Sequence, residues 1–160
     1  MNVARLRAPL EAPQLREFVA ALAPVNALAD AAHGFVWRLQ DEGGDATAVP
    51  VLGDPRLIVN LSVWESLDVL RAFVYNGHHL ELMRRRRDWF ARMEEAYQVL
   101  WWVPTGHRPT VAEAEHRLGL LRAGGSTPEA FTFARPFGPD GMDWSPPEQE
   151  TRSGRIPGVV

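Results

Sequence analysis

Residues 35–40 (FVWRLQ) and 56–64 (RLIVNLSVW) alternate between two kinds of side chain, which is typical of β-strands. One face of these strands, which includes Phe35 and Trp37, is wholly apolar and is expected to pack on helices. The other face is expected to meet solvent or a partner's sheet, because it mixes polar and apolar groups, namely Val36, Arg38, Ile58, Asn60, Ser62 and Trp64. The turn-rich segment 41–55 joins the two strands, so they are expected to be antiparallel neighbours with a long loop between them.

The segments on either side of this strand pair predict helices and two further strands. Residues 2–6 predict a first strand, and a helix is expected from Pro13 to about residue 34, with an apolar stripe of Leu15, Phe18, Val19 and Leu22. Pro24 is expected to kink that helix or to start a new one. Ser66 is a candidate N-cap for a second helix, which continues beyond Asn76-Gly77 as segment 78–90. Residues 98–104 (QVLWWVP) predict a last strand.

This order, β-α-β-β-α-β, predicts an α+β fold with an antiparallel sheet and additions at the C-terminal side. Thr110 and Glu113 form a T-x-x-E capping box that opens an extra helix, and Gly124-Gly125 is expected to end it. Residues 130–135 predict an edge strand. We therefore expect one folded domain over residues 1–135, followed by a Pro/Gly-rich tail over residues 136–160.

Composition narrows the function classes. The chain has 160 residues, of which 46% are hydrophobic, and its formal net charge is -3, which predicts no nucleic-acid partner. No apolar run is long enough to cross a bilayer and no secretory signal is visible, so we expect no membrane association and a cytoplasmic location. Because cysteine is absent, thiol chemistry and cysteine-containing zinc sites are excluded.

Tyr75 and His79 are the candidate catalytic residues. They are four residues apart, so on a continuous helix they share one face and can reach the same ligand. The imidazole of His79 is suited to act as a general base or to ligate haem iron. The alternative is a histidine that is merely hydrogen-bonded at a helix bend. No histidine pair or His-carboxylate triad with metal-ligand spacing occurs, so no other metal site is predicted.

The candidate substrate-binding residues are aromatic or interrupt apolar patterns. The chain has six tryptophans, and some of them are expected to line a pocket for a planar or hydrophobic ligand, the candidates being Trp37, Trp64, Trp89 and Trp102. The alternative for each is a place in the core or in an interface. Arg38, Asn60 and Asn26 are either polar anchors for a ligand or hydrogen-bonded pairs, within the chain or across a dimer.

The basic run 84–87 predicts a solvated or salt-bridged helix, because four consecutive helical residues point in four directions. Arg84 is the member of the run that we keep as a candidate for a ligand carboxylate.

Six segments together resemble the DUF3291 domain family: NVARLRAPL (2–10), PVNALADAAHGFVWRL (24–39), IVNLSVWES (58–66), FVYNGHH (73–79), RRRRDWF (84–90) and VLWWVPTGHRPTVAEAEHRL (99–118). That family is similar to the ferredoxin-like, dimeric α/β-barrel superfamily, which includes antibiotic-biosynthesis monooxygenases and haem-degrading enzymes. The resemblance implies a homodimer whose sheets pair face to face, and a ligand cleft between sheet and helices. It implies no particular reaction, because this fold serves many functions.

Three hypotheses of function follow. The first is an enzyme that acts on a hydrophobic or aromatic metabolite, monooxygenase-like or by acid/base chemistry without a cofactor, with His79 and Tyr75 in proton transfer or substrate orientation. The second is a haem protein with His79 as the iron ligand. The third is a ligand carrier or sensor without catalysis. No phosphate-binding or dinucleotide motif is present, so a nucleotide cofactor is not expected.

Overall fold

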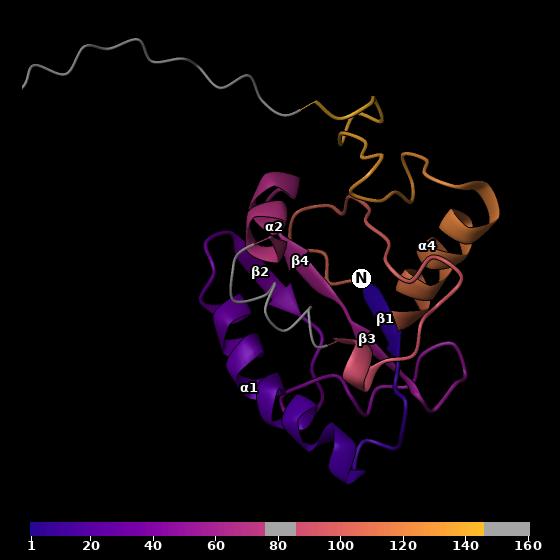
Figure 1. Ribbon diagram of the computed structural model, residues 1–160. Helices are drawn as coiled ribbons and strands as arrows, with labels where there is room; N and C mark the ends of the chain where they lie inside the picture. The colour runs from indigo at the N-terminus through magenta and orange to yellow at the C-terminus, as the bar shows by residue number, and fades with distance from the viewer. Residues whose placement is uncertain (76–85, 146–160) are drawn as a thin grey trace, which may run out of the picture.

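The computed structural model describes residues 1–75 and 86–145 and has a mixed α+β fold (Figure 1). The strands are β1 (Asn2–Arg5), β2 (Phe35–Arg38), β3 (Leu57–Asn60) and β4 (Ser62–Trp64). The helices are a short 3-10 helix η1 (Pro13–Leu15), α1 (Arg16–Asp30), α2 (Leu67–Val74) and α4 (Val111–Gly124). β1 pairs with β3 and β2 pairs with β4, both antiparallel, so the predicted α+β class and the antiparallel sense of the strands are confirmed.

Strand β1 has partners on both of its edges. On one edge it pairs with β3, with Val3 opposite Val59. On the other edge, the Val3 amide donates to the carbonyl of Tyr97 at 2.8 Å, and a bridge joins Asn2 to Gln98. The strand predicted at 98–104 is therefore present only as isolated bridges. Gln98 bridges to Asn2 of β1, whereas Leu100 bridges to Phe131.

The strand predicted over residues 56–64 is divided into β3 and β4, which pair with different partners. In β2 the register shifts between Phe35 and Trp37, as in a β-bulge. This shift places Phe35 opposite Trp64, and the two rings meet edge to face with centroids 5.3 Å apart. The prediction that Phe35 shares a face with Trp37 is therefore wrong, because strict alternation does not hold through a bulge.

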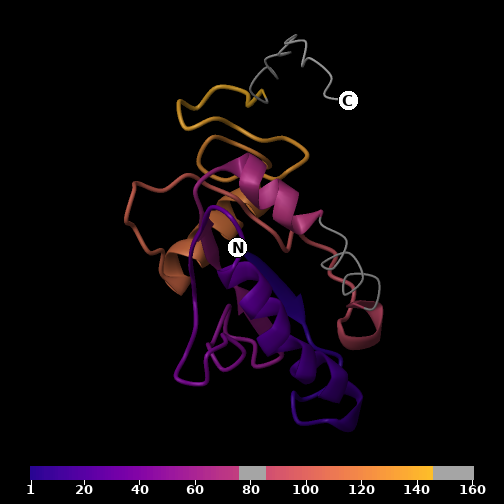
Figure 2. The same cartoon turned by 90° about the vertical axis from the view of Figure 1, so that its left-hand side faces the viewer.

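The two faces of the β1–β3 pair lie against different helices. Val3 and Val59 are buried on one face, in a core that includes Leu118 of α4. On the opposite face, Ile58 packs with Phe18 of α1, and in Figure 2 α1 lies in front of β1. The apolar face thus packs on a helix as predicted. The mixed face of β3, which we expected to meet solvent or a partner's sheet, is turned toward α1 of the same chain.

Helix α1 confirms the predicted helix but changes its apolar stripe. Phe18 and Leu22 face the sheet, whereas Val19 is 41% exposed. The stripe continues through Val25, at the helical spacing of three from Leu22, as the sequence predicts. Pro24 lies inside the helix and no new helix begins there, so of the two alternatives, a kink or a restart, the restart does not occur.

Both predicted helix caps are present. The Ser66 hydroxyl accepts a hydrogen bond from the Val69 amide at 3.2 Å, and the Thr110 hydroxyl accepts one from the Glu113 amide at 3.2 Å. The Glu113 carboxylate bonds to Trp101 and His107 instead of completing the capping box. None of the helices in the described ranges is long and apolar enough to span a membrane.

The chain after α4 packs onto the domain as irregular structure. Residues 130–135 form only isolated bridges, one of which joins Phe131 to Leu100, so the predicted edge strand is not formed. Phe137 is buried in a cluster with Leu67, Leu100 and Phe131, and Trp144 packs against that cluster. The packed chain thus extends beyond the boundary predicted at residue 135. Residues 146–160 of the predicted tail lie outside the described residues.

Gly34 is required by both its backbone conformation and its surroundings. Its φ is +71°, and a Cβ at this position would lie 2.7 Å from a methyl carbon of Val69 in α2. We expect Gly34→Ala to lower the free energy of unfolding by about 2–3 kcal/mol, from left-handed strain plus overpacking. Gly44→Ala is the control in urea denaturation, because Gly44 has φ +86° and a Cβ there would meet no atom within 4 Å. Equal losses for the two variants would contradict the contact with Val69.

Candidate functional site

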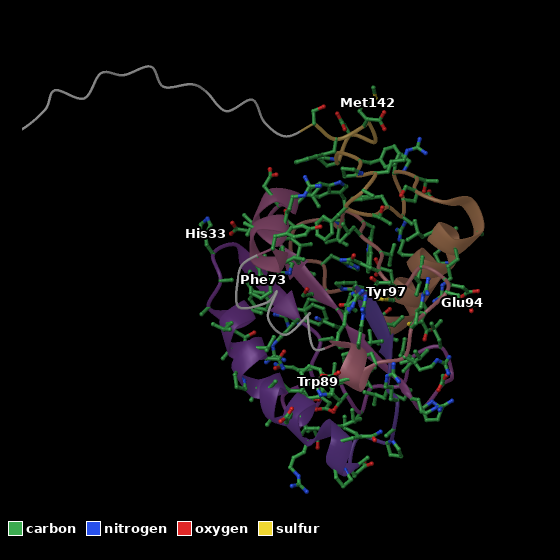
Figure 3. The ribbon with its side chains drawn as sticks, viewed as in Figure 1. His33, Phe73, Trp89, Glu94, Tyr97 and Met142 are labelled. Carbon is green, nitrogen blue, oxygen red and sulfur yellow. The ribbon has the colours of Figure 1, made fainter. Side chains whose placement is uncertain are left out.

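A cleft of about 200 Å³ lies between α1 and the β1–β3 pair. One wall is α1, the floor is the mixed face of β1 and β3, and the remaining sides come from segments 38–47 and 86–90. Trp89, from the helical turn 86–89, lies between α1 and the sheet in Figure 3. The cleft is lined by Asn2, Ala4, Phe18, Ala21, Leu22, Val25, Asn26, Arg38, Leu39, Asp45, Ala46, Thr47, Ile58, Val59, Asn60, Arg86, Trp89 and Phe90.

Three aromatic rings form the apolar end of the cleft. The ring of Phe18 lies 5.7 Å from that of Trp89 and 5.1 Å from that of Phe90, between centroids. Main-chain bonds hold this segment against β1, because the Arg7 amide donates to the Trp89 carbonyl at 2.9 Å and the Ala91 amide donates to the Arg5 carbonyl at 2.8 Å. The cluster is therefore fixed by the sheet edge and by α1 together, and it offers a rigid surface to a flat ligand.

Three asparagine side chains form the polar end of the cleft. Asn2 and Asn60 are directly opposite each other across β1 and β3, and Asn26 comes from α1. The chain has four asparagines, and the fourth, Asn76, lies outside the described residues. The side chains of the three form no hydrogen bond within the ranges 1–75 and 86–145. Each amide can both donate and accept, so the cleft has unused hydrogen-bonding capacity of both kinds.

Arg38 is held by the protein. Its Nε donates to Oδ1 of Asp30 at 2.8 Å, Nη2 donates to Oδ2 at 3.2 Å, and Nη1 donates to the Gly44 carbonyl at 2.8 Å. The side chain is 15% exposed. This bidentate pair joins the end of α1 to β2 and to the loop after it. Arg38 therefore has an ion-pair partner within the chain. Its main effect on the cleft is to hold α1, β2 and the following loop in place, because Asp30 neutralises its charge.

Two other charged groups line the cleft. Oδ1 of Asp45 accepts hydrogen bonds from the Thr47 amide at 2.8 Å and the Thr47 hydroxyl at 2.7 Å, which shapes the loop at that side. Arg86 is exposed, and its Nη1 lies 3.5 Å from the Tyr97 hydroxyl. Arg86 has no ion pair with the described residues, so it is the guanidinium of the cleft that stays available to a ligand.

The structure brings four of the predicted site residues together in the cleft, namely Asn26, Arg38, Asn60 and Trp89. It does not bring Tyr75 there: this residue ends α2, is 57% exposed, and contacts Phe133 edge to face. His79 and Arg84 lie outside the described residues.

The other three candidate tryptophans lie away from the cleft. Trp37 packs against the core under α4. The indole N–H of Trp64 donates to the Ser62 hydroxyl at 2.9 Å, and that of Trp102 donates to the Phe137 carbonyl at 2.8 Å. For Trp37 and Trp64, these contacts agree with the structural alternative given above.

Several cleft residues were not predicted from the sequence. Asn2 was missed because its position opposite Asn60 depends on the register of two strands that are far apart in the chain. Arg86 belongs to the basic run that we interpreted as solvated, and only its place beside Trp89 and Phe90 brings it to the cleft. A signal was nevertheless present, since an asparagine in a short apolar strand is unusual.

The comparisons with known proteins identify the family. The model of a domain of unknown function, DUF3291, matches residues 1–146. The chain belongs to the DUF3291 family. The searches of curated proteins and of solved structures gave no match. The described part of this DUF3291 chain has no group of three or more histidine and carboxylate side chains placed to hold a metal ion.

Proposed function

We propose that this protein binds a small, flat, uncharged molecule in the cleft between α1 and the β1–β3 pair. The observation that carries the proposal is the set of three asparagine amides, from three elements, that face one cleft without hydrogen-bond partners in the described chain. Asn2 and Asn26 are half-buried, whereas Asn60 is exposed. A half-buried polar group gains most from a ligand that completes its hydrogen bonds. A ligand that presents carbonyl, hydroxyl or N–H groups would do so.

The charge of the cleft favours a neutral ligand. The positive charge of Arg38 is balanced by Asp30, and the carboxylate of Asp45 is hydrogen-bonded to Thr47. Asp45 and Arg86, one of each sign, line the cleft without an ion pair in the described ranges, so the cleft has no net excess of either charge. Pockets for larger ligands measure roughly 300–1,000 Å³, so a volume of about 200 Å³ fits a ligand with a single ring. That ring would rest on Phe18, Trp89 and Phe90.

Three hypotheses stay predictions: that the protein is an enzyme with His79 as its base, that it binds haem through His79, and that it forms a homodimer. The cleft is the site that we assign to the substrate in the enzymatic hypothesis and to the ligand in the carrier hypothesis. Tyr75, the second catalytic candidate, is not among the cleft residues. Binding is therefore the part of the function for which the geometry gives the strongest support.

We also propose that the strands follow the ferredoxin-like order. The pairing of β1 with β3, the pairing of β2 with β4, and the bridge between Asn2 and Gln98 support an antiparallel order of segment 97–100, β1, β3–β4 and β2. In this arrangement α1 covers one face of the central strands. The face-to-face sheet pairing of a dimeric barrel would need the opposite face, where α4 now packs; sedimentation velocity tests whether the chain forms a dimer at all.

The binding proposal is tested with benzamide, whose ring and neutral amide match the two ends of the cleft, and with toluene, which lacks the amide. We expect the double variant Asn26→Leu/Asn60→Leu to lower the affinity for benzamide about tenfold, because two hydrogen bonds are lost. Its affinity for toluene should change little. Ligand-observed NMR titrations give both affinities.

Gln14→Leu is the matched control, because it removes an exposed amide outside the cleft. In a labelled sample, benzamide should shift the side-chain NH₂ signals of the cleft asparagines and leave that of Gln14 in place. Equal affinities of the double variant and the unaltered protein, with both folded by circular dichroism, would refute the proposal.

A further inference from the structure

A second hollow, of about 420 Å³, shares no residue with the cleft. It lies between α4, the pair Trp101 and Trp102, and the irregular segment 128–141. In Figures 1 and 2 this orange-to-yellow part of the chain lies at the end of the molecule away from the N-terminal half of α1. The proposed function does not use this hollow, so an inference about it stands independently.

The two tryptophans give the hollow rigid aromatic walls. The indole N–H of Trp101 donates to Oε1 of Glu113 at 3.1 Å, and the other carboxylate oxygen of Glu113 lies 2.8 Å from Nε2 of His107. The indole N–H of Trp102 donates to the Phe137 carbonyl at 2.8 Å. Both N–H groups are thus used by the protein. What the half-buried indoles can offer a ligand is their carbon surface, which suits a flat aromatic group.

Arg117 gives the hollow a cation with unused donors. It is one turn after Glu113 on α4, and its Nη1 donates to the Glu129 carbonyl at 3.0 Å. Its Nε is buried without a hydrogen-bond partner. No carboxylate of the described residues lies within ion-pair distance of it. The buried Nε is out of reach of a ligand, so the donors that remain for one are on Nη1 and Nη2. Such a pair favours a carboxylate ligand, because the planar N–H groups of a guanidinium match two carboxylate oxygens.

The acidic residues of the hollow limit the charge of the ligand. Glu129 and Asp140 also line it, and both are exposed. Oδ1 of Asp140 accepts from the Met142 amide at 3.1 Å, which holds this carboxylate in a turn. Like charges repel a second negative group on the ligand. A molecule with one carboxylate is therefore favoured over one with two.

We propose that the hollow beside α4 binds an aryl carboxylate, a small aromatic molecule with a single carboxylate group. The carboxylate pairs with Arg117, and the ring lies on Trp101 and Trp102.

The test uses three probes that differ in charge: 3-phenylpropionate, its neutral amide 3-phenylpropionamide, and the dianion benzylmalonate. We expect the unaltered protein to bind 3-phenylpropionate about tenfold more tightly than either of the other two, from charge-assisted hydrogen bonds to Arg117. Isothermal titration calorimetry gives the affinities. In NMR spectra, 3-phenylpropionate should shift the indole N–H signals of Trp101 and Trp102.

The variants separate charge from packing. Arg117→Gln should abolish the preference for the acid over the amide, and Arg117→Lys should keep part of it. Trp101→Leu should lower the affinities for 3-phenylpropionate and for 3-phenylpropionamide by a similar factor. Arg108→Gln, which removes an exposed arginine outside the hollow, and Asn60→Leu, in the cleft, should change neither affinity. The proposal is overturned if the folded Arg117→Gln protein keeps the preference, if acid and amide bind equally to the unaltered protein, or if the acid does not bind at millimolar concentration.

Discussion

Replacing Trp89 with alanine is expected to lower the free energy of unfolding by about 3–5 kcal/mol, as for other large aromatic residues that are removed from a core. Trp89 is 4% exposed and belongs to a buried cluster with Leu6 and Leu15. Its ring also contacts Phe18 and Phe90, and so links α1 to the segment at the edge of β1. The main-chain bond from Arg7 to residue 89 remains in the variant, so the loss comes from the side chain.

The same substitution should weaken ligand binding in the cleft. The ring of Trp89 forms part of its apolar end, and truncation leaves a flat ligand with fewer contacts. We expect the affinity for benzamide to fall about tenfold, in proportion to the aromatic contact that is lost. Urea denaturation and the NMR titration measure the two effects on one sample.

Trp89→Phe is the control for this prediction, because it keeps an aromatic ring, leaves a smaller cavity than alanine and should therefore cost less stability than Trp89→Ala. A loss of under about 1 kcal/mol for the alanine variant would mean that the cluster is repacked without the ring. Unchanged benzamide affinity would show that Trp89 closes the core but does not contact the ligand.

Local signals in the sequence predicted the helices well. The caps at Ser66 and Thr110 are hydrogen bonds between residues three apart, so the sequence contains both partners. The glycine that ends α4, Gly125, has φ +72°, a conformation that glycine adopts readily. The strands near the loop 41–55 were also recognisable from alternation, and their antiparallel pairing followed from the loop.

The parts of the fold that depend on distant contacts could not be predicted in this way. The bulge in β2 turns Phe35 toward Trp64, and nothing in the four residues of that strand predicts it. Which face of the sheet meets a helix depends on where α4 crosses it. α4 begins some fifty residues after β3, and it covers the face that carries Val59. The alternation therefore indicated which residues of a strand share a face, but not which helix covers that face.

The residues of the candidate site were likewise predictable only in part. Asn26 and Asn60 were found because amides interrupt apolar patterns, and the structure places both in one cleft. The tryptophans were less informative, since an aromatic ring packs equally well in a core, where Trp37 lies, and in a cleft, where Trp89 lies. Polar residues in apolar segments thus predicted the lining of the cleft better than aromatic residues did.

The stability of the protein is expected to fall as the pH drops from about 8 to about 5, because of the amino group of Met1. This group is buried and donates to the Val99 carbonyl at 2.9 Å, while the Val99 amide donates back to the Met1 carbonyl at 2.9 Å. Burial disfavours the charged ammonium and lowers the pKa of the amine from 8.0 to about 5. In the unfolded chain the amine is exposed to water, where its pKa returns to the ordinary value.

The sign follows from proton binding. Between pH 8 and pH 5 the unfolded chain takes up a proton at this amine and the folded chain does not, so acid favours unfolding. The contribution is fully present above pH 8 and is lost on the way down to pH 5. A lowering of the pKa from 8.0 to about 5 corresponds to a loss on the order of 4 kcal/mol.

The carboxyl of Glu113 affects the stability of the protein at lower pH than the amine of Met1 does. Burial raises the pKa of its carboxyl, but hydrogen bonds from His107 and Trp101, with the positive charges of His107 and Arg117, outweigh burial and hold the pKa below its usual value. A carboxyl with a lowered pKa contributes stability that is present above its unfolded value of 4.5 and is lost as the pH falls further. The two effects can therefore be separated by pH.

The measurement is urea denaturation between pH 5 and pH 8 on the chain that begins at Met1 and on the same chain with an acetylated N-terminus. Acetylation removes the titrating amine and leaves every other ionisable group in place, so the difference between the two curves isolates Met1. Acetylation adds bulk next to residue 99 and is expected to lower stability by a constant amount. What tests the prediction is therefore the slope: the free chain should lose more stability toward pH 5 than the acetylated one, and parallel curves would place the amine of Met1 in water.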